Sequence, residues 1–143
     1  MRPSSPTGPS DDLHGTESVL VVEDEPTVRL VVRSILKRSG YRVAESETGE
    51  AALALWAEQN GGFDLLVTDL VMPGNLGGEE LAEKLREERP DLRVLLTTGY
   101  VDNSISEERF AKLGMSLLRK PYTAEELLQA VRRCLQRDDP AEP

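Results

Sequence analysis

The feature that most constrains the fold is a regular alternation of short apolar runs with segments of helical periodicity. Residues 19–22 form a continuous apolar run, which is typical of a strand that is covered on both faces. Apolar residues then recur at helical spacing at Val28, Val31, Val32 and Ile35. Gly40 follows as a helix stop signal. This part of the chain therefore predicts a strand followed by a helix.

The same scheme repeats along the chain. Further strands are predicted at 41–45, 64–68, 92–97 and 115–118, and further helices at 50–59, at 79–88, in a short segment near 104–107 and after 123. Thr48 is a predicted N-cap, and Ser104 with Glu107 and Thr123 with Glu126 form capping-box pairs. Five strands that alternate with five helices predict a parallel sheet with helices on both faces.

The length of 143 residues suits one domain. Residues 1–16 are dominated by Pro, Ser, Gly, Thr and Asp, so we expect a flexible tail or linker there. We predict a single domain over residues 17–137 and a second flexible end over 138–143.

Composition excludes several functions. A net charge of -9 disfavours a general nucleic-acid surface and favours a cation or a basic partner. The single cysteine, Cys134, excludes an internal disulfide, and the single histidine, His14, argues against a zinc site. No apolar run approaches the roughly 20 residues of a membrane span, and the N-terminus lacks a secretory h-region. We therefore expect a cytoplasmic protein without membrane contact.

The polar residues that follow the predicted strands carry the main functional signal. In a parallel α/β sheet, ligands bind outside the carboxyl ends of the strands. Four of the five strands deliver polar or charged residues to that edge: Glu23, Asp24 and Glu25; Asp69; Thr97 and Thr98; and Arg119 and Lys120, followed by Pro121. Gathered carboxylates stay ionised together only if a cation compensates them. Magnesium does so with one or two carboxylates, waters and a phosphoryl oxygen.

The other groups fit phosphoryl chemistry. An aspartate can form an acyl phosphate, a lysine can neutralise phosphoryl oxygens, and a threonine can donate a hydrogen bond to them. Asp69, Lys120 and Thr98 supply one of each. Taken singly, the charged residues have structural alternatives: acids after a strand favour a helix N-terminus, Asp69 could be a turn residue before Met72-Pro73, and Lys120 could be a solvated lysine before proline. Their joint placement at one edge favours a site.

Four ordered stretches resemble the receiver domain of two-component response regulators: VLVVEDEP, LLVTDLVMPG, VLLTTGY and LLRKPYT. The resemblance covers residues 18–136. It implies a flavodoxin-like (βα)5 three-layer sandwich with strand order 2-1-3-4-5. It also implies a signalling phosphoacceptor that is not an enzyme in its own right, beyond self-phosphorylation and slow self-dephosphorylation.

The resemblance further implies residue roles. Asp69 would take a phosphoryl group from a phosphohistidine of a sensor kinase or phosphotransfer protein. Glu23 and Asp24 would hold Mg²⁺, together with Asp69 and the backbone carbonyl of Val71. Lys120 would pair with Asp69 and then with its phosphate.

Three more positions complete the implied set. Thr98 would move toward the phosphoryl group, Gly99 would leave it accessible, and Pro121 would follow a cis peptide bond. The face formed by the fourth helix, fifth strand and fifth helix would contact an effector or a second copy, with no direct nucleic-acid binding.

Some positions depart from the family pattern. Leu117 stands where many receivers carry Tyr or Phe, so any switch that involves Thr98 must work with a smaller apolar side chain. Gly77 stands where an aspartate is frequent, in a glycine-rich loop that we expect to be mobile. Val71 and Tyr100 are apolar and bulky, and we hypothesise that they lengthen the lifetime of the phosphoryl group.

Two functional alternatives stay open. A magnesium-dependent phosphatase or phosphotransferase of the haloacid dehalogenase type would also use strand-end aspartates, but it needs a second aspartate where Val71 stands. A degenerate receiver would act only as a binding platform, which the intact set of Glu23, Asp24, Asp69, Thr98 and Lys120 disfavours.

The context of the domain also stays open. The chain ends soon after the last predicted helix, so we expect no DNA-binding output domain within it. It fits a stand-alone regulator or the terminal receiver of a hybrid sensor kinase, and the stretches GTESVLVVEDE and LLTTGYVDN favour the second.

Overall fold

Over the part of the chain that the structure describes, five strands alternate with five helices. The computed structural model describes residues 13–72, 74, 76–99 and 107–136. The elements are β1 (Ser18–Val22), α1 (Pro26–Arg38), β2 (Arg42–Ser46), α2 (Gly49–Glu58), β3 (Leu65–Asp69), α3 (Gly78–Glu88), β4 (Arg93–Thr98), α4 (Glu107–Lys112), β5 (Met115–Arg119) and α5 (Ala124–Gln136). The strands form one parallel sheet in the order β2-β1-β3-β4-β5, which confirms the predicted topology.

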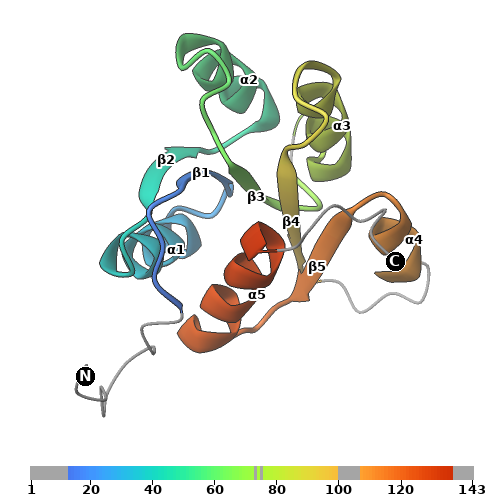
Figure 1. The fold of residues 1–143 in the computed structure, drawn as a ribbon. Helices are drawn as coiled ribbons and strands as arrows, with labels where there is room; N and C mark the ends of the chain where they lie inside the picture. The colour runs from blue at the N-terminus through green and yellow to red at the C-terminus, as the bar shows by residue number, and fades with distance from the viewer. Residues whose placement is uncertain (1–12, 73, 75, 100–106, 137–143) are drawn as a thin grey trace.

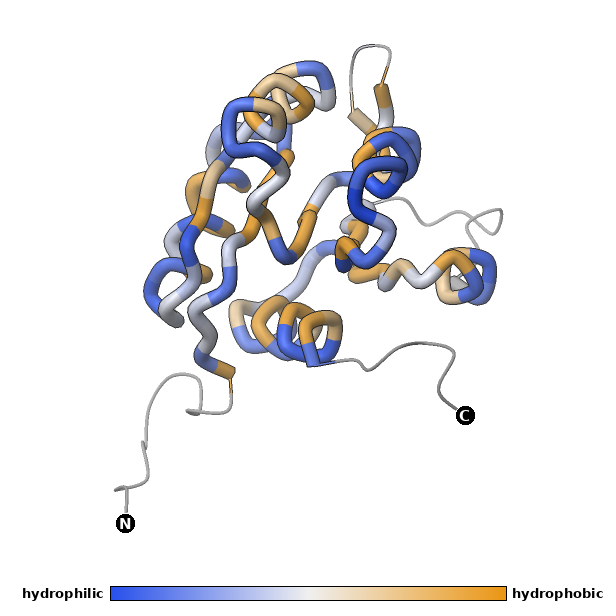
Figure 2. Tube along the Cα trace, turned by 45° about the horizontal axis from the view of Figure 1, so that its top comes forward, coloured by the Kyte–Doolittle hydropathy of each residue, from blue (hydrophilic) through white to orange (hydrophobic). Residues whose placement is uncertain are grey.

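Helices cover both faces of this sheet (Figure 1). Alternate residues of β1 point to opposite faces, as the pleat of a strand requires. Leu20 and Val22 join a core cluster with residues of α2, α3 and α4, whereas Val19 and Val21 join a second cluster with residues of α1 and α5. Figure 2 shows helices that carry both apolar and polar residues around strands that are largely apolar. This three-layer arrangement is the predicted sandwich.

Four strands, β2, β3, β4 and β5, end one residue later than predicted. The ladder continues because the amide of Leu70 donates to the carbonyl of Thr97 and the amide of Lys120 donates to that of Thr98, both at 2.7 Å. Asp69 and Thr98 are therefore the last residues of β3 and β4. Both side chains are thus placed by regular strand geometry and not by a loop.

The predicted helix caps are confirmed where the structure describes them. The Thr48 hydroxyl accepts a hydrogen bond from the Ala51 amide at the start of α2. Thr123 and Glu126 form the reciprocal capping box before α5. The predicted partner of Glu107, Ser104, lies outside the described residues.

The last residues of the expected tail pack against the domain. Leu13 is buried, and the amide of Gly15 donates to the carbonyl of Ser39 at 3.0 Å. Arg132 of α5 pairs with Glu17 at 3.1 Å. The packed part of the chain therefore begins before residue 17. Within the described residues, no helix has the length and apolar character that crossing a membrane requires.

Candidate functional site

Three carboxylates meet at the carboxyl edge of the sheet. Glu23 and Asp24 follow β1 directly, and Asp69 ends the neighbouring strand β3, which pairs with β1 in register. One oxygen from each of the three lies within 4.8 Å of the others. Glu23 is 3% exposed, while Asp24 and Asp69 are partly buried. The structure thus brings together the three acidic side chains predicted to hold a metal.

Glu23 and Glu25, in the loop after β1, have different structural roles. The Glu23 amide continues the sheet by donating to the carbonyl of Ser46 at 3.1 Å, and the Glu25 amide donates to Oε2 of Glu23 at 3.1 Å. Helix α1 starts at Pro26, whose fixed φ suits the first helical position. Glu25 is therefore the exposed N-cap of α1 and not a member of the site.

Lys120 supplies the positive charge opposite the acids. Its Nζ donates to Oε1 of Glu23 at 3.1 Å and to Oδ2 of Asp69 at 3.4 Å. It follows β5 directly, and its peptide bond to Pro121 is cis, as the resemblance implied. Arg119, the other cation at this strand end, is exposed.

The site carries an excess of negative charge. Burial, reinforced by the charge of Glu23, raises the pKa of Asp69 to about 6 despite the opposing effect of Lys120. Burial alone would lower the pKa of Lys120, but Asp69 and Glu23 outweigh it and raise that pKa above its ordinary value. Both raised pKa values mean that the site binds protons more tightly than free side chains do, so a bound cation would also be favoured there. A hard divalent cation with carboxylate ligands fits this donor set.

The other predicted residues that the structure describes, Val71, Thr98 and Gly99, lie at or just beyond the ends of β3 and β4. Thr98 is 1% exposed at the end of β4, one residue beyond the register partner of Asp69. A Cβ on Gly99 would lie 3.9 Å from the nearest atom, Cδ of Lys120, so the space beside Lys120 is open. Val71 is 52% exposed, and its carbonyl as a metal ligand stays a prediction. Tyr100 lies outside the described residues.

Gly78 contributes to the site in a way that sequence reasoning missed. It is the first residue of α3, and a Cβ there would lie 2.2 Å from the carbonyl oxygen of Asp69. The amide of Gly78 also donates to the carbonyl of Leu70 at 3.0 Å. Only glycine permits this close approach of α3 to the end of β3. The glycine-rich loop was noted in the sequence, but a local pattern cannot show which glycine touches Asp69.

Two further residues near the site, Tyr122 and Arg29, were given no role in the sequence analysis. Tyr122 packs into the cluster under α1 and α5, and burial raises its pKa, with smaller effects from Lys120 and Glu23. Arg29 donates to the backbone carbonyl of Glu23 at 2.7 Å. The Tyr122 contacts depend on the packing of α1 and α5, whereas Arg29 reaches back six residues across the turn between β1 and α1. The spacing of apolar residues reveals neither.

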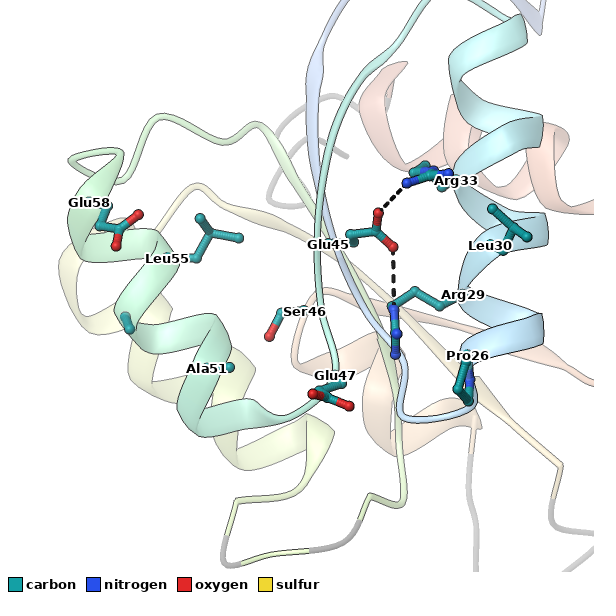
Figure 3. Close-up of a pocket in the computed structure, with 11 residues that line it drawn as sticks. Pro26, Arg29, Leu30, Arg33, Glu45, Ser46, Glu47, Ala51, Leu55 and Glu58 are labelled. Carbon is teal, nitrogen blue, oxygen red and sulfur yellow. Dashed lines mark hydrogen bonds and ion pairs between the residues drawn. The ribbon is translucent and has the colours of Figure 1, made fainter.

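A groove between α1 and α2 lies beside the acidic loop, with Arg29 in its lining (Figure 3). Its lining includes Pro26, Leu30 and Glu47, but it includes none of the three acids. The groove therefore offers no alternative centre for the phosphoryl chemistry that the strand ends support.

Comparison with known proteins agrees with this geometry. The sequence model of the response regulator receiver domain matches residues 19–132. The chain is 34% identical over 128 residues to the sensor kinase CckA of Brucella abortus, covering 90% of this chain and 13% of that protein. It is 30% identical over 117 residues to the response regulator receiver protein CpdR of the same organism, covering 82% of this chain and 95% of that one.

A solved structure is similar as well. The crystal structure of the receiver domain from the hybrid histidine kinase CckA superposes with a TM-score of 0.70 at 34% identity, covering 83% of this chain and 99% of that one. These matches do not favour the phosphatase alternative, which also lacks its second aspartate at Val71. The protein described here belongs to the response regulator receiver domain family of two-component signalling systems.

Proposed function

We propose that the chain accepts a phosphoryl group from a phosphohistidine onto Asp69 in a magnesium-dependent reaction. The observation that carries this proposal is the convergence of Glu23, Asp24 and Asp69, with Lys120 in contact with two of them. The partner is a sensor histidine kinase or a histidine phosphotransfer protein. A cytoplasmic location stays a prediction from the sequence.

The site residues divide the work. Oxygens of Glu23, Asp24 and Asp69, with the carbonyl of Val71, would hold the metal. Bound there, Mg²⁺ would offset the negative charge of the transferred group. A carboxylate oxygen of Asp69 attacks phosphorus, a P–O bond forms, and the P–N bond to the donor imidazole breaks, leaving its electron pair on the ring nitrogen.

Protonation and charge set the conditions for this step. Only the ionised carboxylate of Asp69 is a nucleophile, and a pKa of about 6 leaves it largely ionised at neutral pH. Lys120, which pairs with the Asp69 carboxylate before transfer, pairs with the phosphoryl oxygens after it. Thr98, at the end of the adjacent strand, donates a hydrogen bond from its hydroxyl to the phosphoryl group. Catalysis is therefore positioning plus electrostatics, and we expect slow self-dephosphorylation at most.

The output is a change of shape and not a product. Phosphorylation adds about -1.5 to -2 charges at the edge of the sheet. The α4, β5 and α5 face is the proposed responder, either toward an effector or toward a second copy. Leu117 of β5 pairs in register with Leu96 and packs against the core, so any coupling to Thr98 works through an aliphatic side chain.

The larger context is also a proposal. CckA is a sensor kinase of which this chain spans 13%, whereas it spans 95% of CpdR. The relatives therefore include both contexts left open by the sequence. We favour the receiver of a hybrid kinase, because the stretches GTESVLVVEDE and LLTTGYVDN resemble those of hybrid-kinase receivers.

Intact mass spectrometry tests the proposed function. The protein is incubated with magnesium and a small acyl-phosphate donor, and one added phosphoryl group is expected. Asp69→Asn should show none, and a chelator should suppress the adduct in the native protein. If the native protein gains no adduct with several donors, the binding-platform alternative is favoured instead.

A further inference from the structure

Arg29, near the start of α1, connects the acidic loop to the edge strand β2. Its Nη1 donates to the backbone carbonyl of Glu23 at 2.7 Å, and its Nε pairs with Oε1 of Glu45 at 3.3 Å. The Arg29 side chain is 20% exposed. Figure 3 shows Arg29 and Glu45 pointing toward one another from α1 and β2. The guanidinium therefore lies between a fixed strand and the backbone of the loop.

The carbonyl that Arg29 holds belongs to the peptide unit between Glu23 and Asp24. A peptide unit is planar, so the direction of its carbonyl also sets the direction of the Asp24 amide. The two Cα atoms of this unit carry the two acidic side chains. The amide of Glu23 is already tied to Ser46 on β2, and its carboxylate is tied to Lys120. The contact with Arg29 restrains the remaining polar backbone group of Glu23.

Glu45 holds the guanidinium in place and also binds a second arginine. Its Oε2 accepts from Nη1 of Arg33 at 2.6 Å, while Oε1 faces Arg29. Arg33 lies one turn further along α1, away from the acidic loop. The two arginines share one carboxylate, but the contact with the loop described above belongs to Arg29. Arg33 is therefore a matched control for the loss of an ion pair with Glu45.

We propose that Arg29, anchored by Glu45, is a positioning residue that orients the Glu23–Asp24 peptide and thereby sets the affinity of the acidic site for a divalent cation. This inference rests on the proposed function, because it concerns the same metal site. Residues that orient the ligands of a metal without touching it commonly change metal affinity by about 10- to 100-fold when mutated.

Magnesium titration by calorimetry near neutral pH tests the proposal. Arg29→Met keeps much of the aliphatic side chain and removes the guanidinium, and we expect Mg²⁺ to bind about tenfold more weakly. Arg33→Met removes an ion pair with the same carboxylate and should leave the affinity within about twofold of the native value, since such pairs act locally. Arg29→Lys should recover part of the loss, because one ammonium group can still donate to the carbonyl of Glu23.

A second measurement needs no metal. In chelator-treated protein, hydrogen exchange at the amides of Asp24 and Glu25 should be faster in Arg29→Met than in Arg33→Met. Thermal unfolding of both variants shows whether either is globally destabilised. A change in exchange confined to the acidic loop, with similar thermal midpoints, supports the positioning role. Equal exchange in the two variants contradicts it.

Asp24→Asn separates failure of this inference from failure of the proposed function. If magnesium binding is lost in Asp24→Asn but is equal in Arg29→Met and Arg33→Met, the positioning role is overturned and the metal site stands. If the native protein binds no magnesium, or Asp24→Asn binds it as well as the native protein, the proposed metal site is wrong and the inference falls with it.

Discussion

Asp69 is costly to ionise in the metal-free protein. Its pKa is about 6 because the carboxyl is partly buried beside Glu23, against 3.8 ordinarily. A raised pKa means that the folded state binds the proton more tightly, so stability falls as pH rises from about 4 to about 6. Asp69→Asn removes this effect. In the presence of a chelator, we expect Asp69→Asn to raise the free energy of unfolding by about 1 to 3 kcal/mol near pH 7.5 and to have little effect near pH 4.

Urea unfolding at the two pH values measures this difference. Asp64→Asn is a suitable control, because Asp64 lies just before the opposite end of β3, where its exposed carboxylate accepts from the Ser18 amide at 3.0 Å. The Asp64→Asn variant should be no more stable than the native protein near pH 7.5. An Asp69→Asn variant that is no more stable than the native protein near pH 7.5 would contradict the assigned charge balance.

At the scale of elements, the junction of β3 and α3 depends on a glycine. Alanine is a better helix former by about 1 kcal/mol, yet a Cβ on Gly78 would lie 2.2 Å from the carbonyl oxygen of Asp69. We expect Gly78→Ala to lower the free energy of unfolding by about 1 to 3 kcal/mol and to slow phosphorylation of Asp69. Gly77→Ala is the control, since the nearest atom to its Cβ would be 3.4 Å away. Equal unfolding midpoints for the two variants would refute this packing argument.

At the scale of the whole molecule, metal binding and folding are linked. A ligand that binds only the folded state stabilises it by about 2.7 kcal/mol at 100 times its dissociation constant. Magnesium should therefore raise the thermal midpoint of the native protein, and a chelator should reverse the effect. Asp24→Asn should lose most of the gain. A midpoint that does not respond to magnesium would count against the cation site.

The sequence predicted much of this molecule because the relevant signals are local. The alternation of apolar runs and helical periodicity located the strands and helices, and the caps at Thr48 and Thr123 are interactions over three residues. The strand ends were misplaced by one residue at Asp69 and Thr98, because the last ladder bonds depend on the neighbouring strand. The roles of Gly78 and Arg29 were not predicted, since each depends on the detailed path of the turn between a strand and the next helix, which apolar spacing does not reveal.

The sequence by itself determined the elements and the chemistry at their ends: buried strands, acids after β1 and β3, and a lysine after β5. Only the tertiary structure decided that these groups meet. Lys120 reaches Glu23 across 97 positions of sequence because the strand order places β1, β3, β4 and β5 side by side with their carboxyl ends together. The raised pKa of Asp69 has the same origin, since burial and the nearby charge of Glu23 exist only in the folded chain.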